Sequence, residues 1–130
     1  MANIQTEKPK IHLHRFNKTS SCVQSLISIN GRDICNAYEA IERHLPVGTY
    51  LIYAFKGSSL TNSHIRILSK EYGNAKIVLA LPTFLMAYHI CPCGELNNHG
   101  GLFTMGAWKK LFSAFELGTM YELVITSDIK

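Results

Sequence analysis

The chain has 130 residues, of which 47% are apolar and 17% are charged, and its net charge at pH 7 is +4. These values are typical of one folded globular domain and exclude a disordered chain. The basic residues are scattered, so nucleic-acid binding is not indicated. The start lacks a signal-peptide pattern and no apolar run reaches transmembrane length, so we expect a cytoplasmic protein without membrane contact. Residues 1–9 are predicted to be a flexible tail, and residues 10–130 a single β-rich domain.

Residues 10–16 have the two-residue period of a β-strand. One face of this strand carries Ile11, Leu13 and Arg15. The other face carries His12 and His14, a spacing that would suit a metal ion, although a polar strand face is the commoner explanation.

A β-hairpin is predicted over residues 23–38. Its strands are residues 23–29 and 32–38, and Asn30-Gly31 between them suits a type I′ turn, which needs positive φ at both positions. Cys22 and Cys35 either face each other across this hairpin or are two small buried side chains. Four cysteines in a chain of this length do not imply a disulfide framework.

Further strands are predicted from runs of β-branched and aromatic residues at 49–55, 63–68, 75–81 and 119–126. The run at 75–81 is almost continuously apolar, so we expect it in the sheet centre with both faces covered. One amphipathic helix is expected at 105–117, with Gly118 as its C-cap. The predicted fold class is therefore mainly β (α+β): a single compact sheet or barrel-like domain with a hairpin near the N-terminus and one helix before the last strand.

Residues 82–101 form a long predicted loop that contains the residues best suited to chemistry. On an extended segment, His89 and Cys91 point to the same side, so the imidazole could act as a base for a thiol nucleophile. His99 is a second imidazole within this loop. The predicted catalytic residues are Cys91, His89 and His99, while a buried structural thiol at Cys91 is the alternative.

The predicted binding residues in the same loop are Tyr88, Cys93, Asn97 and Asn98. Zinc is a second interpretation, because His89, Cys91, Cys93 and His99 are zinc-ligand types. However, paired zinc cysteines are usually two to four residues apart, and here a single proline separates them. We therefore predict no metal and no cofactor.

The layout resembles that of small bacterial and phage domains of unknown function. The matching pieces are His14-Arg15, residues 26–30, Cys35 with Glu39, residues 45–50, Cys91, Trp108 with Leu111, and residues 118–125. Several of them also look like the L,D-transpeptidase catalytic domain, with Pro46, Gly48, His89, Cys91, Gly118 and Thr119 in comparable places. This resemblance implies a β-rich fold in which Cys91 attacks an acyl group beside His89.

Two functions follow from these patterns. The first is a cysteine transpeptidase-like enzyme, of bacterial or phage origin, that acts on peptide or amide substrates of the cell-wall type through Cys91. The second is a non-catalytic binding module that uses the 82–101 loop to contact a peptide or protein ligand. The second is favoured by Ile90, which replaces the glycine before the family's nucleophile, and by the lack of histidine at 79–82.

Overall fold

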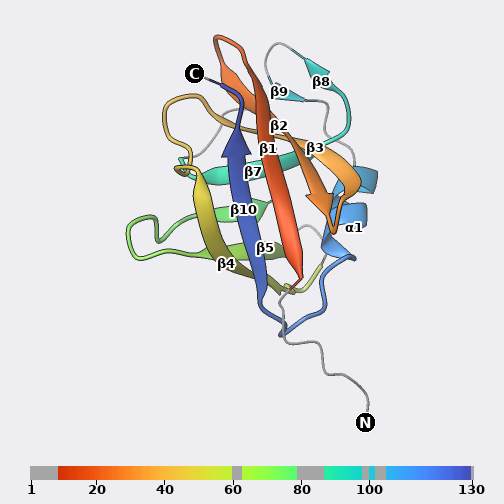
Figure 1. The fold of residues 1–130 in the computed structure, drawn as a ribbon. Helices are drawn as coiled ribbons and strands as arrows, with labels where there is room; N and C mark the ends of the chain where they lie inside the picture. Colours follow the sequence, from red (N-terminus) through yellow and green to blue (C-terminus); the bar gives the residue numbers. More distant parts are fainter. Residues whose placement is uncertain (1–8, 60–62, 79–86, 98–99, 102–104, 130) are drawn as a thin grey trace.

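The structure, a computed structural model, describes residues 9–59, 63–78, 87–97, 100–101 and 105–129. Eight strands form a closed barrel in the order β1-β10-β4-β5-β6-β7-β3-β2, which confirms the predicted mainly β fold (Figure 1). The barrel strands are β1 (Lys10–Lys18), β2 (Cys22–Ile29), β3 (Arg32–Ala40), β4 (Gly48–Phe55), β5 (His64–Leu68), β6 (Lys76–Val78), β7 (His89–Cys93) and β10 (Tyr121–Ser127). A separate two-stranded sheet joins β8 (Leu96–Asn97) to β9 (Gly100–Gly101), and one helix, α1 (Met105–Phe112), precedes β10.

Two pairs of parallel strands bring distant parts of the chain together. β1 pairs with β10, so that Leu13 lies opposite Ile125, and β6 pairs with β7, so that Ile77 lies opposite Ile90. The remaining barrel neighbours in the described part of the chain are antiparallel. The first and last strands of the domain therefore complete the barrel wall side by side.

The predicted hairpin is present as β2 and β3. Asn30 and Gly31 have φ values of 52° and 81°, the positive values that a type I′ turn requires at both positions. The cysteines near it do not face each other, because Cys22 lies opposite Ala40 and Cys35 lies opposite Ile27. Cys22 is fully buried, as expected if it is a small buried side chain. Cys35 is only partly buried.

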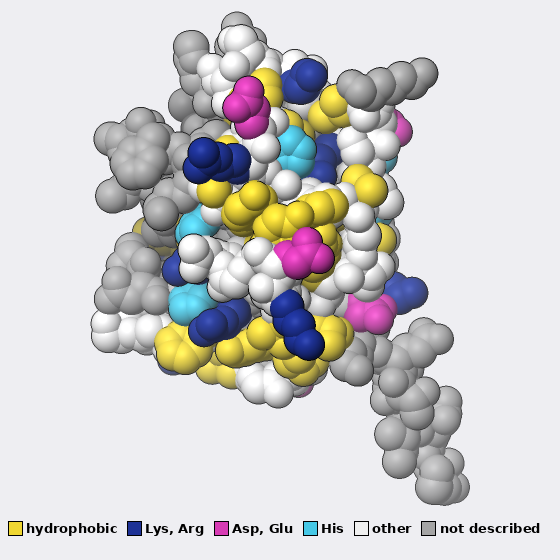
Figure 2. Space-filling model, turned by 90° about the vertical axis from the view of Figure 1, so that its left-hand side faces the viewer, with side chains coloured by type: hydrophobic (Ala, Val, Ile, Leu, Met, Phe, Trp, Pro, Cys, Tyr) yellow, Lys and Arg dark blue, Asp and Glu magenta, His cyan; other side chains and the backbone are white. Residues whose placement is uncertain are grey.

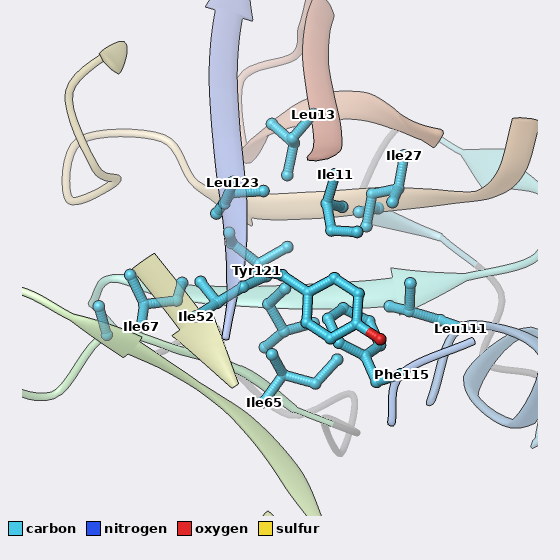
Figure 3. Packing of buried hydrophobic residues seen from close by; sticks show 14 of the residues in the cluster. Ile11, Leu13, Ile27, Ile52, Ile65, Ile67, Leu111, Phe115, Tyr121 and Leu123 are labelled. Carbon is cyan, nitrogen blue, oxygen red and sulfur yellow. The ribbon is translucent and has the colours of Figure 1, made fainter. Parts of the chain in front are cut away.

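The barrel interior is filled mainly with aliphatic side chains (Figure 3). Fully buried members come from every part of the wall and include Ile11, Leu13, Ile27, Ile52, Ile65, Ile67, Ile77, Ile90 and Leu123. The helix region adds Trp108, Leu111 and Phe115 to the same cluster, and α1 packs against β3 and β7. The apolar stripe of the predicted helix thus belongs to the core at one end of the barrel.

The helix is shorter than predicted, since it ends at Phe112 rather than at residue 117. Turns follow, and within them Phe115 returns to the core, where its ring lies 4.7 Å from that of Tyr121. Gly118 has a φ of +83°, so the left-handed conformation expected there is present, but in the turn beyond the helix.

The predicted loop at 82–101 is wrong in part, because it contains β7, β8 and β9. β7 occupies a place in the barrel between β6 and β3, with Pro92 opposite Ala37.

The strand predicted at 75–81 was expected to have both faces buried, and its described residues do not show this. Ile77 is fully buried, but its neighbours Lys76 and Val78 are only half-buried.

The outer face of β4 and β5 carries exposed apolar side chains. Leu51 lies opposite Leu68, and the ring of Phe55 stacks on His64 with centroids 5.1 Å apart. On the side of the molecule where these strands lie, hydrophobic groups gather with Lys and Arg between them (Figure 2). In the part of the chain that is described, no helix has the length and apolar character needed to cross a membrane.

Trp108 is the largest side chain that is fully buried, so its truncation tests whether the helix closes the core. We expect Trp108→Ala to lower the free energy of unfolding by about 3–5 kcal/mol, because a cavity replaces the indole. Urea denaturation measures this change. Leu117→Ala is the control, since that side chain is 54% exposed and its loss should change stability by no more than about 0.5 kcal/mol. Equal effects of the two substitutions would contradict this packing.

Candidate functional site

The predicted nucleophile lies in a small cluster on the outer face of the barrel. Ile90 belongs to the interior core, so its neighbours in β7, His89 and Cys91, point to the other side of the wall. Cys91 and Cys93 pack there with two side chains of the neighbouring strands, Cys22 and Tyr38. The structure therefore places three of the four thiols together, in a cluster that β2, β3 and β7 build.

The hairpin of β8 and β9 covers this cluster. Leu96 packs against it, and a Cβ atom on Gly101 would lie only 2.3 Å from Cys93 Sγ. Glycine at this position therefore lets the backbone of β9 lie directly on the cysteine. As a result, Cys93 is completely buried and Cys91 is only 2% exposed.

The Cys91 thiol has the properties of a buried side chain. Burial, followed by the nearby Glu39 carboxylate and Cys93, raises its pKa from 9.0 to about 12. Burial also raises the pKa of Cys93 to about 12. A nucleophilic cysteine needs the opposite shift, because the thiolate is the reactive form. The geometry in this state favours the structural alternative, and the catalytic role of Cys91 stays a prediction.

His89 is buried at the start of β7 and shares the outward side of the strand with Cys91. Its Nδ1 lies 2.9 Å from the carbonyl oxygen of Ala87. A carbonyl only accepts hydrogen bonds, so Nδ1 carries a proton and Nε2 is the nitrogen that could act as a base. No hydrogen bond between this imidazole and Cys91 is observed among the described residues.

Of the other predicted site residues, Cys93 packs beside Cys91 in this cluster, whereas Tyr88 and Asn97 make different contacts. Tyr88 has a φ of 62°, and its ring lies 4.6 Å from that of Tyr72, packed against the interior core. Asn97 lies in β8, where its carbonyl oxygen accepts a hydrogen bond from Gln24 Nε2. Asn98 and His99 lie outside the described residues.

Metal binding at the cysteines is not supported by the described residues, since they contain no group of three or more His, Cys, Asp or Glu side chains arranged to hold an ion. The zinc interpretation included His99, which is outside them, so it stays untested.

A buried ion pair inside the barrel was not anticipated from the sequence. Arg15 Nε donates to Glu39 Oε1 at 3.2 Å, and Arg15 Nη2 donates to Glu39 Oε2 at 2.6 Å. The same Nη2 donates to the Leu45 carbonyl oxygen at 2.7 Å. The Arg15 and Glu39 side chains are 4% and 1% exposed, so both charges are removed from water. This forked contact joins β1 to β3 and to the connection that leads to β4.

A pocket of about 380 Å³ lies beside this ion pair. It is at the end of the barrel where β1 and β10 finish and β2 begins. Its lining is partly basic and partly aliphatic: Arg15, Lys18, Val23, Ile41, His44, Leu45, Pro46, Val47, Ser127 and Ile129. The mouth of a β-barrel is a common place for a ligand site, and an eight-stranded barrel can hold one small ligand.

His44 has a defined orientation in this lining. Its Nδ1 lies 2.8 Å from the Ala40 carbonyl oxygen, which can only accept, so Nδ1 carries a proton. Nε2 is therefore the nitrogen available to a ligand. One signal for this site was visible in the sequence, because Arg15 has the same phase as Ile11 and Leu13 and must lie on the buried face. Its partner Glu39 is distant in the chain, and nothing local indicates the pairing.

No known protein family, curated protein or solved structure matches the chain.

The burial of Cys91 gives a direct test by alkylation. With a pKa of about 12 in place of 9.0, the thiolate population at neutral pH falls roughly a thousandfold, and access is blocked as well. We expect iodoacetamide at pH 7.5 to label Cys91 in the native protein at least a thousandfold more slowly than in urea. Peptide mapping by mass spectrometry locates the label. Cys35 is partly buried and burial also raises its pKa to about 12, so a difference between the two cysteines reports access to the thiol. Faster labelling of Cys91 in the native protein than in urea would support the enzyme instead.

The Arg15–Glu39 pair predicts a strong asymmetry between single and double substitutions. Glu39→Gln leaves the guanidinium charge buried without its counter-ion, so we expect a loss of about 3–5 kcal/mol in the free energy of unfolding. Arg15→Met combined with Glu39→Leu removes both charges and should cost less than the single change. Urea denaturation of the three proteins tests this. A double variant less stable than Glu39→Gln would show that the pair itself is strongly stabilising.

Proposed function

We propose that this protein is a non-catalytic binding module that holds a small carboxylate ligand in the pocket at the barrel mouth, and that the ligand is the free C-terminal residue of a peptide. The observation that carries the proposal is the combination of a buried, fixed arginine with an aliphatic pocket wall. This proposal keeps the binding role expected from the sequence but moves it from the 82–101 loop to the pocket around Arg15.

Charge complementarity supports an anionic ligand. A guanidinium has five N–H donors, and the contacts of Arg15 with Glu39 and Leu45 use the donors of Nε and Nη2. The two N–H groups of Nη1 are the ones that could donate to a ligand. Glu39 balances the Arg15 charge, so Lys18 would supply the positive charge that attracts a carboxylate.

The size and apolar lining support a short ligand segment. A pocket of about 380 Å³ is near the lower end of the range for small-molecule sites. Val23, Leu45 and Val47 offer aliphatic contacts beside the basic groups. This arrangement suits one or two residues with a small apolar side chain and a terminal carboxylate. A larger peptide would extend past Val47, which is exposed at the rim.

Acyl transfer by Cys91, the function implied by the resemblance to L,D-transpeptidases, is the second proposal. One observation favours it: β7 places His89 and Cys91 on the same face of the strand. It would require the β8–β9 hairpin to move away from the thiol before reaction. The alkylation experiment above distinguishes the two proposals, because the binding module does not need a reactive Cys91.

The binding proposal is tested with N-acetyl-Ala-Ala and its C-terminal amide as probes. We expect the acid to shift the backbone amide signals of Lys18, His44 and Val47 in a ¹⁵N–¹H NMR titration, and to bind at least tenfold more tightly than the amide, since a charge-assisted hydrogen bond is lost. Lys18→Ala should weaken binding of the acid several-fold.

Lys56→Ala is the matched control, because Lys56 is exposed and lies outside the pocket lining. Its affinity for the acid should equal that of the unchanged protein. Equal binding of acid and amide, or shifts that do not include the pocket residues, would contradict the proposal.

A further inference from the structure

A second pocket, on the outer face of β5 and β6, is lined by basic side chains. It has a volume of about 130 Å³ and is formed by the two strands and the turn that connects them. Ile65 and Ile77 are fully buried in the barrel interior, so the residues next to them in β5 and β6 point outward. The residues that line the pocket are His64, Arg66, Gly73, Asn74, Ala75 and Lys76. This pocket shares no lining residue with the one at the barrel mouth.

Strand pairing brings two of these positive charges together, although they are ten residues apart in the sequence. Arg66 lies directly opposite Lys76 in the antiparallel pair of β5 and β6, a position in which Cβ atoms are about 4.5–5.5 Å apart. His64 precedes Arg66 by two residues, so it lies on the same face of β5. Like charges directly opposite one another destabilise a sheet. A bound anion would remove this repulsion.

The protein supplies no counter-charge to this pocket in the part of the chain that is described. No carboxylate lines the pocket, and neither Arg66 nor Lys76 forms an ion pair with a described residue. The segments next to the two strands in the chain, residues 60–62 and 79–86, contain no Asp or Glu. Burial, followed by the charges of Lys76 and Arg66, lowers the pKa of His64. The contribution of these two charges indicates a positive potential at the ring.

We propose that this pocket binds the phosphate group of a small phosphate monoester. Arg66 can donate two parallel N–H groups to two phosphate oxygens, Lys76 adds a second charge, and His64 can donate from one ring nitrogen. A monoester has a charge of about −1.5 to −2 at pH 7 and three terminal oxygens, so it can use all three donors. A carboxylate has a single charge and two oxygens.

The volume also indicates that a single anionic group occupies the pocket. Pockets for whole small molecules have volumes of roughly 300–1,000 Å³, and a water molecule in the liquid takes about 30 Å³. A space of about 130 Å³ therefore holds one hydrated or partly hydrated group, with the rest of the ligand outside.

The apolar surface beside the pocket suits the organic part of the ligand. The Phe55 ring stacks on His64 with centroids 5.1 Å apart, and Phe55 is 51% exposed. Leu51 and Leu68 are exposed further along the same two strands. On this side of the molecule, hydrophobic groups lie next to His, Lys and Arg side chains (Figure 2). A flat aromatic group on the ester oxygen could pack on the exposed part of Phe55.

Titrations with sodium phosphate and with phenyl phosphate at pH 7, followed by ¹⁵N–¹H NMR, test the site. Sodium chloride keeps the ionic strength constant, because salt screens exposed charges. We expect both probes to shift the backbone amide signals of His64, Arg66, Asn74 and Lys76. Phenyl phosphate should bind several-fold more tightly than inorganic phosphate, and Phe55→Ala should remove this difference. Arg66→Ala and Lys76→Ala should each weaken phosphate binding about tenfold, since a charge-assisted hydrogen bond is lost.

Arg32→Ala is the matched control, because it removes one exposed positive charge at the β2–β3 turn, outside the pocket lining. Its phosphate affinity should equal that of the unchanged protein. Thermal unfolding verifies that each variant is folded, and Arg66→Ala should not lower the Tm, because it removes a like-charge pair.

The phosphate site is overturned if millimolar phosphate does not shift the pocket signals, or if Arg32→Ala weakens binding as much as Arg66→Ala. Shifts confined to Lys18 and His44 would assign phosphate to the barrel mouth and would also overturn this site. Equal affinities for phenyl phosphate and inorganic phosphate would overturn the assignment of an aromatic ester. A failure of the carboxylate probes at the barrel mouth leaves each of these outcomes unchanged, because the two pockets share no residue.

Discussion

The ion pair between Arg15 and Glu39 is the interaction on which the organisation of the barrel mouth depends. Taking two charges out of water is costly, and the attraction between them offsets that cost only when the geometry is good and the remaining donors are satisfied. Here both guanidinium contacts reach one carboxylate, and the Leu45 carbonyl accepts a further hydrogen bond. β1 is therefore held at one point to the end of β3 and to the connection that follows it, beside the pocket.

The closed barrel wall determines which side chains can lie next to one another. In a barrel, adjacent residues of a strand lie on opposite sides, so Arg15 faces the interior while His14 faces outward. The same alternation places Ile90 in the core and Cys91 beneath the β8–β9 hairpin. The thiol cluster around Cys91 and the basic pocket beside Arg15 are thus separate places, and His14 faces away from the pocket although it is next to Arg15 in the chain.

Features set by local conformation were predictable, and those set by long-range pairing were not. Asn30-Gly31 fixes its hairpin through backbone φ values, which depend on two residues only. β7 was missed because its sequence, with Pro92 between two cysteines, has the composition of a turn, and its place depends on β3 and β6. In the same way Arg15 could be assigned to the buried face, but its partner Glu39 could not, since 24 residues separate them. Gly101 lies directly on Cys93, the neighbour of Cys91 in the thiol cluster, and no pattern around the cysteines indicates this contact.

The most direct measurement of the central interaction is hydrogen exchange at the Arg15 Nε–H group, followed by ¹⁵N–¹H NMR at pH 7. Arg32 is exposed and supplies an internal reference. If Arg15 is buried against Glu39 at the floor of the pocket, its Nε–H exchanges at least a hundredfold more slowly than that of Arg32, and its signal moves when N-acetyl-Ala-Ala is added. Exchange as fast as in Arg32, with no response to the peptide, would contradict both the ion pair and the site built beside it.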